Sequence, residues 1–269
     1  MTTLSQYENQ FDFIHFRRDD GILLMRLHTE DGPFIFSEKA HRAFARAFAA
    51  VAQDEENKVV ILTGTGDRFC ADFNYESFHS TILGDLLNFW IHLRRDGVKM
   101  LTSFLDIPVP VIAAINGPAL SHSELPLLAD VVLSSDNTEF QDATHFIAGL
   151  PPGDGMHIIW GGLLGPNRSR SFLMTGQRIN AEEAQRLGVV AEVLPLGNLL
   201  DRAWSLARSW NKLPRVTLLN TRAMLTATWK RALTDHLHTG LTYEAMAGMT
   251  VNHQPPPAPI FDLMLKKPF

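Results

Sequence analysis

Two short, almost wholly apolar runs place the strongest constraint on how this chain can fold. They read KVVIL at Lys58–Leu62 and VPVIAAI at Val109–Ile115. Neither run alternates apolar with polar residues, so each predicts a strand buried on both faces, which is typical of a parallel sheet between layers of helices. Covering such strands requires many other apolar residues, and 45% of the 269 residues are hydrophobic. The chain is therefore expected to be an α/β protein with a large core.

Helical patterns alternate with further strand candidates along the first two-thirds of the chain. Ser37–Ala52 predicts an amphipathic helix, because a serine can cap its start and two phenylalanines lie four residues apart on one face. Other strands are expected at Gly21–Thr29, Asp130–Ser135, Glu139–Asp142 and Val189–Leu194. Other helices are expected at Leu86–Leu105, at Gly155–Leu164, at Arg168–Leu173, and between a cap at Asn180 and an end at Gly188.

The last third of the chain is helical throughout. Three helices are expected there, over Leu199–Trp210, Arg215–Leu233 and His236–Met249. Strands alternating with helices, followed by helices alone, predict a stack of βαβ-type units closed by a helical extension. Because no low-complexity linker separates them, we place residues 1–195 and residues 196–269 in a single domain.

Composition and charge exclude several classes of partner and site. The formal net charge is −5 at pH 7 and there is no basic run, so binding to nucleic acid or to a membrane surface has no electrostatic support. The single cysteine, Cys70, excludes an intrachain disulfide and a zinc cluster of cysteines. The N-terminus does not have the pattern of a secretory signal, and no apolar run approaches the length of a membrane span. A cytoplasmic location is expected.

Three stretches carry the landmarks of one protein family. They are Val59–Asp72 (VVILTGTGDRFCAD), Val109–Glu124 (VPVIAAINGPALSHSE) and Leu173–Pro195 (LMTGQRINAEEAQRLGVVAEVLP). Together they resemble the crotonase, or enoyl-CoA hydratase/isomerase, superfamily. The resemblance implies a crotonase-type α/β fold, in which a spiral of ββα units is followed by a C-terminal helical region that makes trimer contacts. It therefore also implies a homotrimer or a dimer of trimers.

The resemblance further implies an oxyanion hole made of two backbone N–H groups, which stabilise a developing enolate or alkoxide more than a ground-state carbonyl. One N–H would come from the loop at Cys70–Phe73 and the other from the turn at Ser121–Ser123. Both segments differ from those of acyl-CoA members, because Ser121-His122-Ser123 replaces a run of glycines and the first loop lacks its usual glycine. Since glycines let a backbone approach a ligand closely, these changes argue against an acyl-CoA thioester substrate.

The changes match a smaller branch, the 6-oxocamphor hydrolase-like β-diketone hydrolases. The polar site residues of that branch are matched one by one by His41, His122, His145, Asp154 and Glu244. The resemblance implies a hydrolase that cleaves a carbon–carbon bond of cyclic or bicyclic β-diketones by retro-Claisen attack of water and releases keto acids. It implies no metal and no organic cofactor, and the sequence shows no metal-ligand spacing such as H-E-x-x-H.

A retro-Claisen hydrolysis needs a base for the water, donors for two oxyanions and an acid for the carbon. We expect His145 and Asp154 to form a dyad, in which the carboxylate fixes the imidazole tautomer and supports its transient charge. Glu244 would orient or deprotonate the water, and His122 and His41 would lie near the carbonyl oxygens. The pocket is expected to be compact and apolar, with walls from Phe36, Phe73, Tyr75, Phe78, Trp90 and Phe146.

Simpler interpretations of the same residues stay open. Taken singly, His145 is typical of a hydrogen-bonded core histidine, Asp154 of a turn or capping residue, and Glu244 of a solvated helix face. Cys70 is typical of a loop filler. At the level of function, the first alternative is an acyl-CoA hydratase or isomerase, for which Glu124 is near the required position. The second is a non-catalytic protein that retains the fold, but this would predict the loss of several polar site residues.

Overall fold

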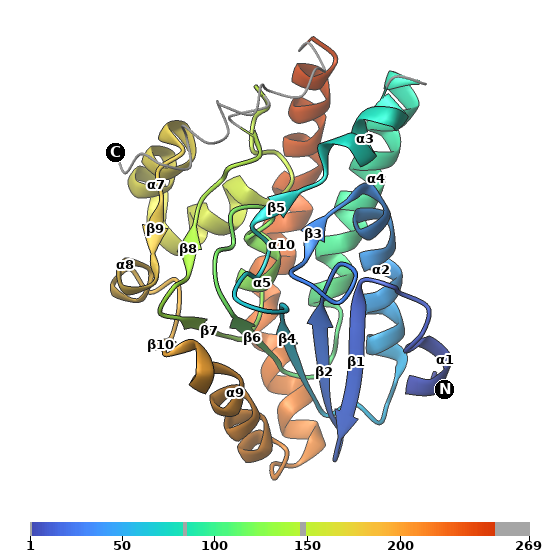
Figure 1. Ribbon diagram of the computed structural model, residues 1–269, viewed down its shortest axis with the longest axis vertical. Helices are drawn as coiled ribbons and strands as arrows, with labels where there is room; N and C mark the ends of the chain where they lie inside the picture. Colours follow the sequence, from blue (N-terminus) through green and yellow to red (C-terminus); the bar gives the residue numbers. More distant parts are fainter. Residues whose placement is uncertain (1, 83–84, 146–148, 251–269) are drawn as a thin grey trace.

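The computed structural model describes residues 2–82, 85–145 and 149–250, and its centre is a six-stranded sheet (Figure 1). The order of strands is β1-β2-β4-β6-β7-β10. Only the β1–β2 pair is antiparallel, and the other four pairs are parallel. The strands span Ile14–Asp19 (β1), Ile22–Leu27 (β2), Val59–Thr63 (β4), Val111–Ile115 (β6), Val131–Ser135 (β7) and Glu192–Leu194 (β10).

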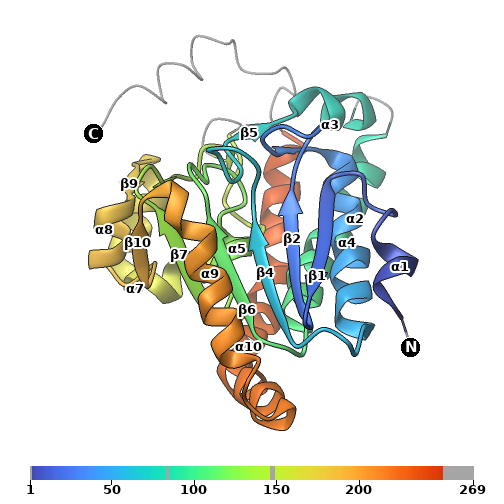
Figure 2. The same cartoon turned by 60° about the horizontal axis from the view of Figure 1, so that its bottom comes forward.

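Both faces of the central strands are buried, as the two apolar runs predict. On β4, Val59 and Ile61 pack on one side with helix α9 (Leu196–Trp210), while Val60 and Leu62 belong to the main core on the other side. Figure 2 shows α9 across one face of the sheet, with the remaining long helices behind it. The main core is closed by α2 (Glu38–Gln53), α4 (Leu86–Leu105) and α10 (Arg215–Gly248).

Segments that follow three neighbouring strands lie side by side beyond the sheet. Isolated bridges pair Cys70 with Ala119, and Ala119 with Phe140. These residues follow β4, β6 and β7 respectively, so the chain leaving each strand meets its neighbour at the same edge. Two small sheets form there, β3 (Ile35–Phe36) with β5 (Asp72–Phe73), and β8 (Glu139–Phe140) with β9 (Ile179–Asn180). The carboxyl edge of a parallel sheet is where open α/β proteins commonly bind ligands.

The longer observed elements follow the predicted ones, with three differences. The two expected helices after residue 214 are one continuous helix, α10, because no glycine or proline interrupts the chain between Leu233 and His236. The two expected helices at 155–173 form α7 (Met156–Thr175), which kinks where Gly165 has non-helical angles before Pro166. Strand β1 was not predicted. Four short helices complete the fold: α1 (Leu4–Tyr7), α3 (Tyr75–Ile82), α5 (Glu124–Leu127) and α8 (Ala181–Arg186).

None of the helices within the described ranges has both the length and the apolar character that crossing a membrane requires.

Candidate functional site

A cluster of buried ionisable groups lies beyond the carboxyl edge of the sheet. Two of its members follow β6, two follow β8, one precedes α7 and one lies on α10. It contains two imidazoles and four carboxyl groups, and the six side chains are each at most 10% exposed: His122, Glu124, Asp142, His145, Asp154 and Glu244. Ionisable groups are rarely buried unless they are paired or functional, so this cluster is the candidate site.

His145 lies between carboxyl groups at both ring nitrogens. Its Nδ1 is 2.8 Å from Oδ1 of Asp142, and the same oxygen accepts the backbone N–H of His145 at 3.3 Å. At the other edge, Nε2 lies 3.4 Å from Oδ2 of Asp154 and 3.9 Å from Oε1 of Glu244. The hydrogen bond at Nδ1 is thus made with Asp142, and the expected pairing of Asp154 with His145 stays a prediction. Asp142 holds the ring at Nδ1, and Asp154 lies at the Nε2 edge together with Glu244.

His122 occupies a position of unusual backbone geometry. Its φ is +48°, in the left-handed region that favours glycine. A histidine with this backbone conformation carries strain of about 1 kcal/mol or more. The ring stacks on Phe36 with 3.8 Å between centroids, and Nδ1 lies 2.8 Å from Oε1 of Glu124 and 3.3 Å from Oδ2 of Asp154. One oxygen of Asp154 therefore faces both imidazoles.

Two glycines bring together the segments that carry Asp154 and Glu244. A Cβ atom on Gly153 would lie 2.2 Å from the carbonyl oxygen of Gly240, and a Cβ atom on Gly240 would lie 2.5 Å from the carbonyl oxygen of Gly153. The turn before α7 and helix α10 therefore touch backbone to backbone. Glu244 is one helical turn beyond Gly240, on the same face of α10, so the contact brings its carboxyl group to the cluster.

Burial and the attraction between opposite charges decide which groups of the cluster are charged. Burial opposes the positive charge of His145, but Asp142 and Asp154 outweigh it and hold the pKa of His145 well above its usual value. Burial likewise opposes the negative charge of Asp142, but His145 lowers the pKa of that carboxyl. These two residues form a buried ion pair. Burial lowers the pKa of His122 to about 4, so its imidazole is neutral at pH 7.

The pKa values of the other three carboxyl groups are raised, whereas that of Asp142 is lowered. Burial raises the pKa of Glu124 to about 8 and that of Glu244 to about 8, and it also raises the pKa of Asp154. Burial therefore favours the neutral, protonated form of both glutamates. The cluster can accept a proton at Asp154, whose carboxyl group faces the charged His145, and donate one from a carboxylic acid, which are the two functions that general acid–base catalysis requires.

The predicted aromatic walls are only partly brought together. Phe36, Phe73 and Phe78 stack on one another, and Phe36 and Phe73 also stack on His122, while Tyr75 contacts Phe73. Trp90 instead contacts Phe89, and its ring fills the space beside Gly248 near the end of α10. Phe146 lies outside the described residues.

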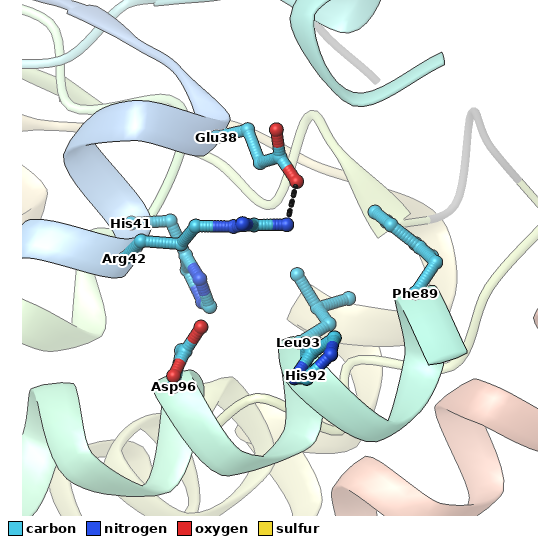
Figure 3. Close-up of a pocket in the computed structure, with 7 residues that line it drawn as sticks. All are labelled: Glu38, His41, Arg42, Phe89, His92, Leu93 and Asp96. Atoms are coloured by element: carbon cyan, nitrogen blue, oxygen red, sulfur yellow. Dashed lines mark hydrogen bonds and ion pairs between the residues drawn. The ribbon is translucent and has the colours of Figure 1, made fainter. Parts of the chain in front are cut away.

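His41 lies between the cluster and a separate pocket. Its ring, on α2, is 6.3 Å from that of His122 and 5.9 Å from that of Phe36. On its other side it lines a pocket between α2 and α4, where Figure 3 shows it pointing toward Asp96. The pocket is lined by Glu38, His41, Arg42, Phe89, His92, Leu93 and Asp96. Burial and the nearby His122 lower the pKa of His41 to about 3, so it is a neutral group that shapes the wall behind His122.

The two segments expected to form an oxyanion hole are adjacent. The N–H of Ser121 donates to the carbonyl oxygen of Cys70 at 3.1 Å, and the N–H of Cys70 donates to the carbonyl oxygen of Pro118 at 3.2 Å. These two N–H groups are therefore engaged within the protein, which narrows the expected donors to Ala71–Phe73 and His122–Ser123. The Cys70 thiol is buried and its pKa is raised, in agreement with a structural role.

Sequence reasoning missed Asp142 and considered Glu124 only for acyl-CoA chemistry. Asp142 precedes His145 by three residues and Glu124 follows His122 by two, so local spacing around each histidine was the available signal. His122, Glu124 and Asp154 also offer ligand atoms within 4.8 Å of one another, which a divalent cation could use. His15, His28 and Asp31 offer a second such group, but the two imidazoles are stacked 3.6 Å apart at 4°, so their in-plane lone pairs do not converge.

A sequence model described as enoyl-CoA hydratase/isomerase matches residues 17–254. The chain is similar to a carnitinyl-CoA dehydratase from Proteus mirabilis (strain HI4320), with 33% identity over 196 residues that cover 72% of each protein. It is also similar to a probable peroxisomal enoyl-CoA hydratase from Arabidopsis thaliana, with 29% identity over 182 residues that cover 67% of this chain and 66% of that protein.

Two solved structures are similar along most of their length. One is a β-diketone hydrolase from the cyanobacterium Anabaena sp. PCC 7120, bound to (S)-3-oxocyclohexyl acetic acid, with 43% identity and a TM-score of 0.87 over 90% of this chain and 96% of that one. The other is an enoyl-CoA hydratase/isomerase from Mycobacterium paratuberculosis, with 22% identity and a TM-score of 0.82 over 96% and 99%. The second bears on the fold alone.

Proposed function

Because the chain belongs to the enoyl-CoA hydratase/isomerase family and has the crotonase-type fold, we propose that it is a hydrolase of cyclic or bicyclic β-diketones within that family. The observation that carries the proposal is the His145 ring held between two carboxyl groups, with Asp142 at Nδ1 and Asp154 at Nε2. His122 at the other side of Asp154 and Glu244 beside Nε2 complete a set that can bind, activate and protonate without a cofactor.

The proposed reaction begins with water beside Nε2 of His145. The water oxygen bonds to one carbonyl carbon as a proton passes to the carboxylate of Asp154 beside the charged His145, and backbone N–H groups hold the alkoxide. The alkoxide collapses and the bond to the carbon between the two carbonyls breaks, so the electron pair leaves as an enolate. Glu244 protonates the enolate carbon and recovers a proton from Asp154. One molecule of water is added in total.

The ligand of the 43% identical hydrolase indicates which diketones suit such a site. A 3-oxocyclohexyl acetic acid is the product expected when water opens a bicyclooctane-2,6-dione with three two-carbon bridges. The carbon between the carbonyls of that dione is a bridgehead, so it cannot lose its proton to form a planar enolate. Deprotonation at this carbon therefore does not compete with the attack of water on a carbonyl. Phe36, Phe73 and Phe78 supply the apolar wall that a compact bicycle would contact.

We expect the purified protein to hydrolyse this bicyclic dione to the keto acid without CoA and without added metal. The reaction can be followed by chromatography of the dione and the acid, with and without a chelator. Crotonyl-CoA, incubated under the same conditions, is the matched control. A strict requirement for metal, or turnover of the acyl-CoA alone, would contradict the proposal.

An acyl-CoA hydratase or isomerase is the second candidate function. It is favoured by the carnitinyl-CoA dehydratase relatives and by the buried Glu124, which follows the turn where acyl-CoA members have their glycines. The altered turn counts against it, because His122 stacks on Phe36 where that glycine run would leave room. Hydration of crotonyl-CoA in the control reaction would select this candidate.

We also propose that the protein is a homotrimer or a dimer of trimers, as expected from the family. Exposed apolar side chains along α10 would be covered by neighbours, among them Val216, Met224 and Leu225. An obligate interface commonly buries upwards of ~2,000 Å² in total. Light scattering at micromolar concentration should therefore give the mass of three or six chains, and a monomer would contradict this assembly.

A further inference from the structure

The His122 ring has one polar atom left for a ligand. Its Nδ1 is engaged by Glu124 at 2.8 Å and faces Asp154 at 3.3 Å, and one ring face is covered by Phe36. The remaining polar atom is Nε2. A neutral imidazole has one donor and one acceptor nitrogen. If Nε2 carries the ring proton, it can donate to a carbonyl oxygen, and if Nδ1 carries it, Nε2 repels that oxygen.

Glu124 is in a position to make that choice. Its side chain is fully buried, at 0% exposed, and its second carboxyl oxygen has no hydrogen-bond partner among the described residues. A hydrogen bond between Oε1 and Nδ1 requires one proton, which either the glutamate or the imidazole carries. If the glutamate keeps it, Nε2 of His122 carries the ring proton and donates. If the glutamate is ionised, Nδ1 carries the proton and Nε2 becomes an acceptor.

The charges around Glu124 favour the first arrangement. His145 and Asp142 already form an ion pair, so an ionised Glu124 would add an uncompensated negative charge to a buried cluster that also holds Asp154 and Glu244. Burial raises the pKa of Glu124 to about 8, and burial lowers the pKa of His122 to about 4, which agrees with two neutral partners at pH 7.

We propose that Glu124 is a positioning residue that donates its carboxyl proton to Nδ1 of His122 and so presents Nε2–H to the carbonyl oxygen of the substrate. The part of this inference that concerns the reaction rests on the proposed function. A neutral imidazole that donates in this way stabilises the alkoxide without supplying a proton that the base must later recover. Glutamine at position 124 can donate from its amide to Nδ1, whereas leucine has a similar size and no donor.

The test combines a spectrum with kinetics on E124Q and E124L. Long-range ¹H–¹⁵N spectra of the imidazole rings, with His122 assigned by its loss in H122F, should show the Nε2–H form in the wild type and in E124Q. The E124L variant should lose that single form. With the bicyclic dione, kcat of E124Q should stay within about threefold of wild type, and kcat of E124L should fall about 10²-fold, as for the loss of one oxyanion donor.

Two outcomes would overturn the inference: an Nδ1–H form of His122 in the wild type, or a loss of kcat in E124Q as large as in E124L. If E124L does not fold, the wild-type and E124Q spectra still decide. The spectra need no substrate. A protein that shows the Nε2–H form but turns over no diketone would therefore refute the proposed function and leave the role of Glu124 intact.

Discussion

Asp154→Asn is expected to lower kcat by at least about 10²-fold, the lower end of what acid–base assistance contributes, while thermal stability and KM change little. Oδ2 of Asp154 faces Nε2 of His145 at 3.4 Å and Nδ1 of His122 at 3.3 Å, so its charge acts where the water proton is transferred. Oδ1 accepts the backbone N–H of Met156 at 3.4 Å, and an asparagine oxygen can still accept it. The substitution thus removes the charge and keeps the local backbone contact.

The companion variants are His145→Ala and the double substitution. His145→Ala should cost a similar factor, and the double variant little more than either, because the members of one catalytic pair act as a unit. Steady-state kinetics on the three variants, with thermal melts alongside, measure this. If Asp154→Asn retains more than about a third of wild-type kcat, or if the two effects multiply, Asp154 is a turn residue and not a partner of His145.

Asp142→Asn is expected to move the pKa of His145 downward and to lower kcat by about 10²-fold at neutral pH. Asparagine can accept the Nδ1–H bond, so the tautomer persists, but the negative charge that balances the imidazolium is lost. Because the Asp142 charge raises the pKa of His145, its removal lowers that pKa, and the limb of the pH–rate profile that belongs to His145 moves to lower pH. An NMR titration of the His145 ring measures the shift directly.

The same substitution has a signature in stability. Asp142 contributes to the free energy of unfolding at pH values above the pKa that a carboxyl group has in the unfolded chain. This contribution is lost as the pH falls through the lowered pKa of Asp142 in the folded protein. His145 contributes to the free energy of unfolding at pH values below the pKa that an imidazole has in the unfolded chain. This contribution is lost as the pH rises through the raised pKa of His145 in the folded protein. The difference in melting temperature between wild type and Asp142→Asn should therefore be largest between these limits. A His145 titration that is unchanged in the variant would show that the pair is not coupled as described.

Much of the fold could be predicted because burial on both faces leaves a clear pattern. The run at Lys58–Leu62 predicted β4, and the run at Val109–Ile115 predicted β6, because strands covered on each side cannot alternate with polar residues. Strand β1 was missed for the opposite reason. It lies at the edge of the sheet, and its second half, Arg17-Arg18-Asp19, is polar on both faces, so only Ile14 and Phe16 mark its apolar side.

The sequence indicated four residues of the cluster, but it did not indicate which carboxyl group contacts which histidine nitrogen. His122, His145, Asp154 and Glu244 were expected from resemblance, and the structure places them in one cluster. The partner of a histidine ring is decided by the direction of side chains, which sequence spacing does not fix. The contact of Asp142 with Nδ1 of His145 was therefore not predicted.

Helix α10 is one unbroken element of 34 residues, so it is about 51 Å long. Its first half exposes Met224 and Leu225, and its last turns deliver Glu244 to the cluster past the contact of Gly153 with Gly240. Because α10 is continuous, a displacement of one half of the helix also moves the other half. If a neighbouring subunit packed on the exposed half, a displacement of that half would move the Glu244 carboxyl group relative to His145.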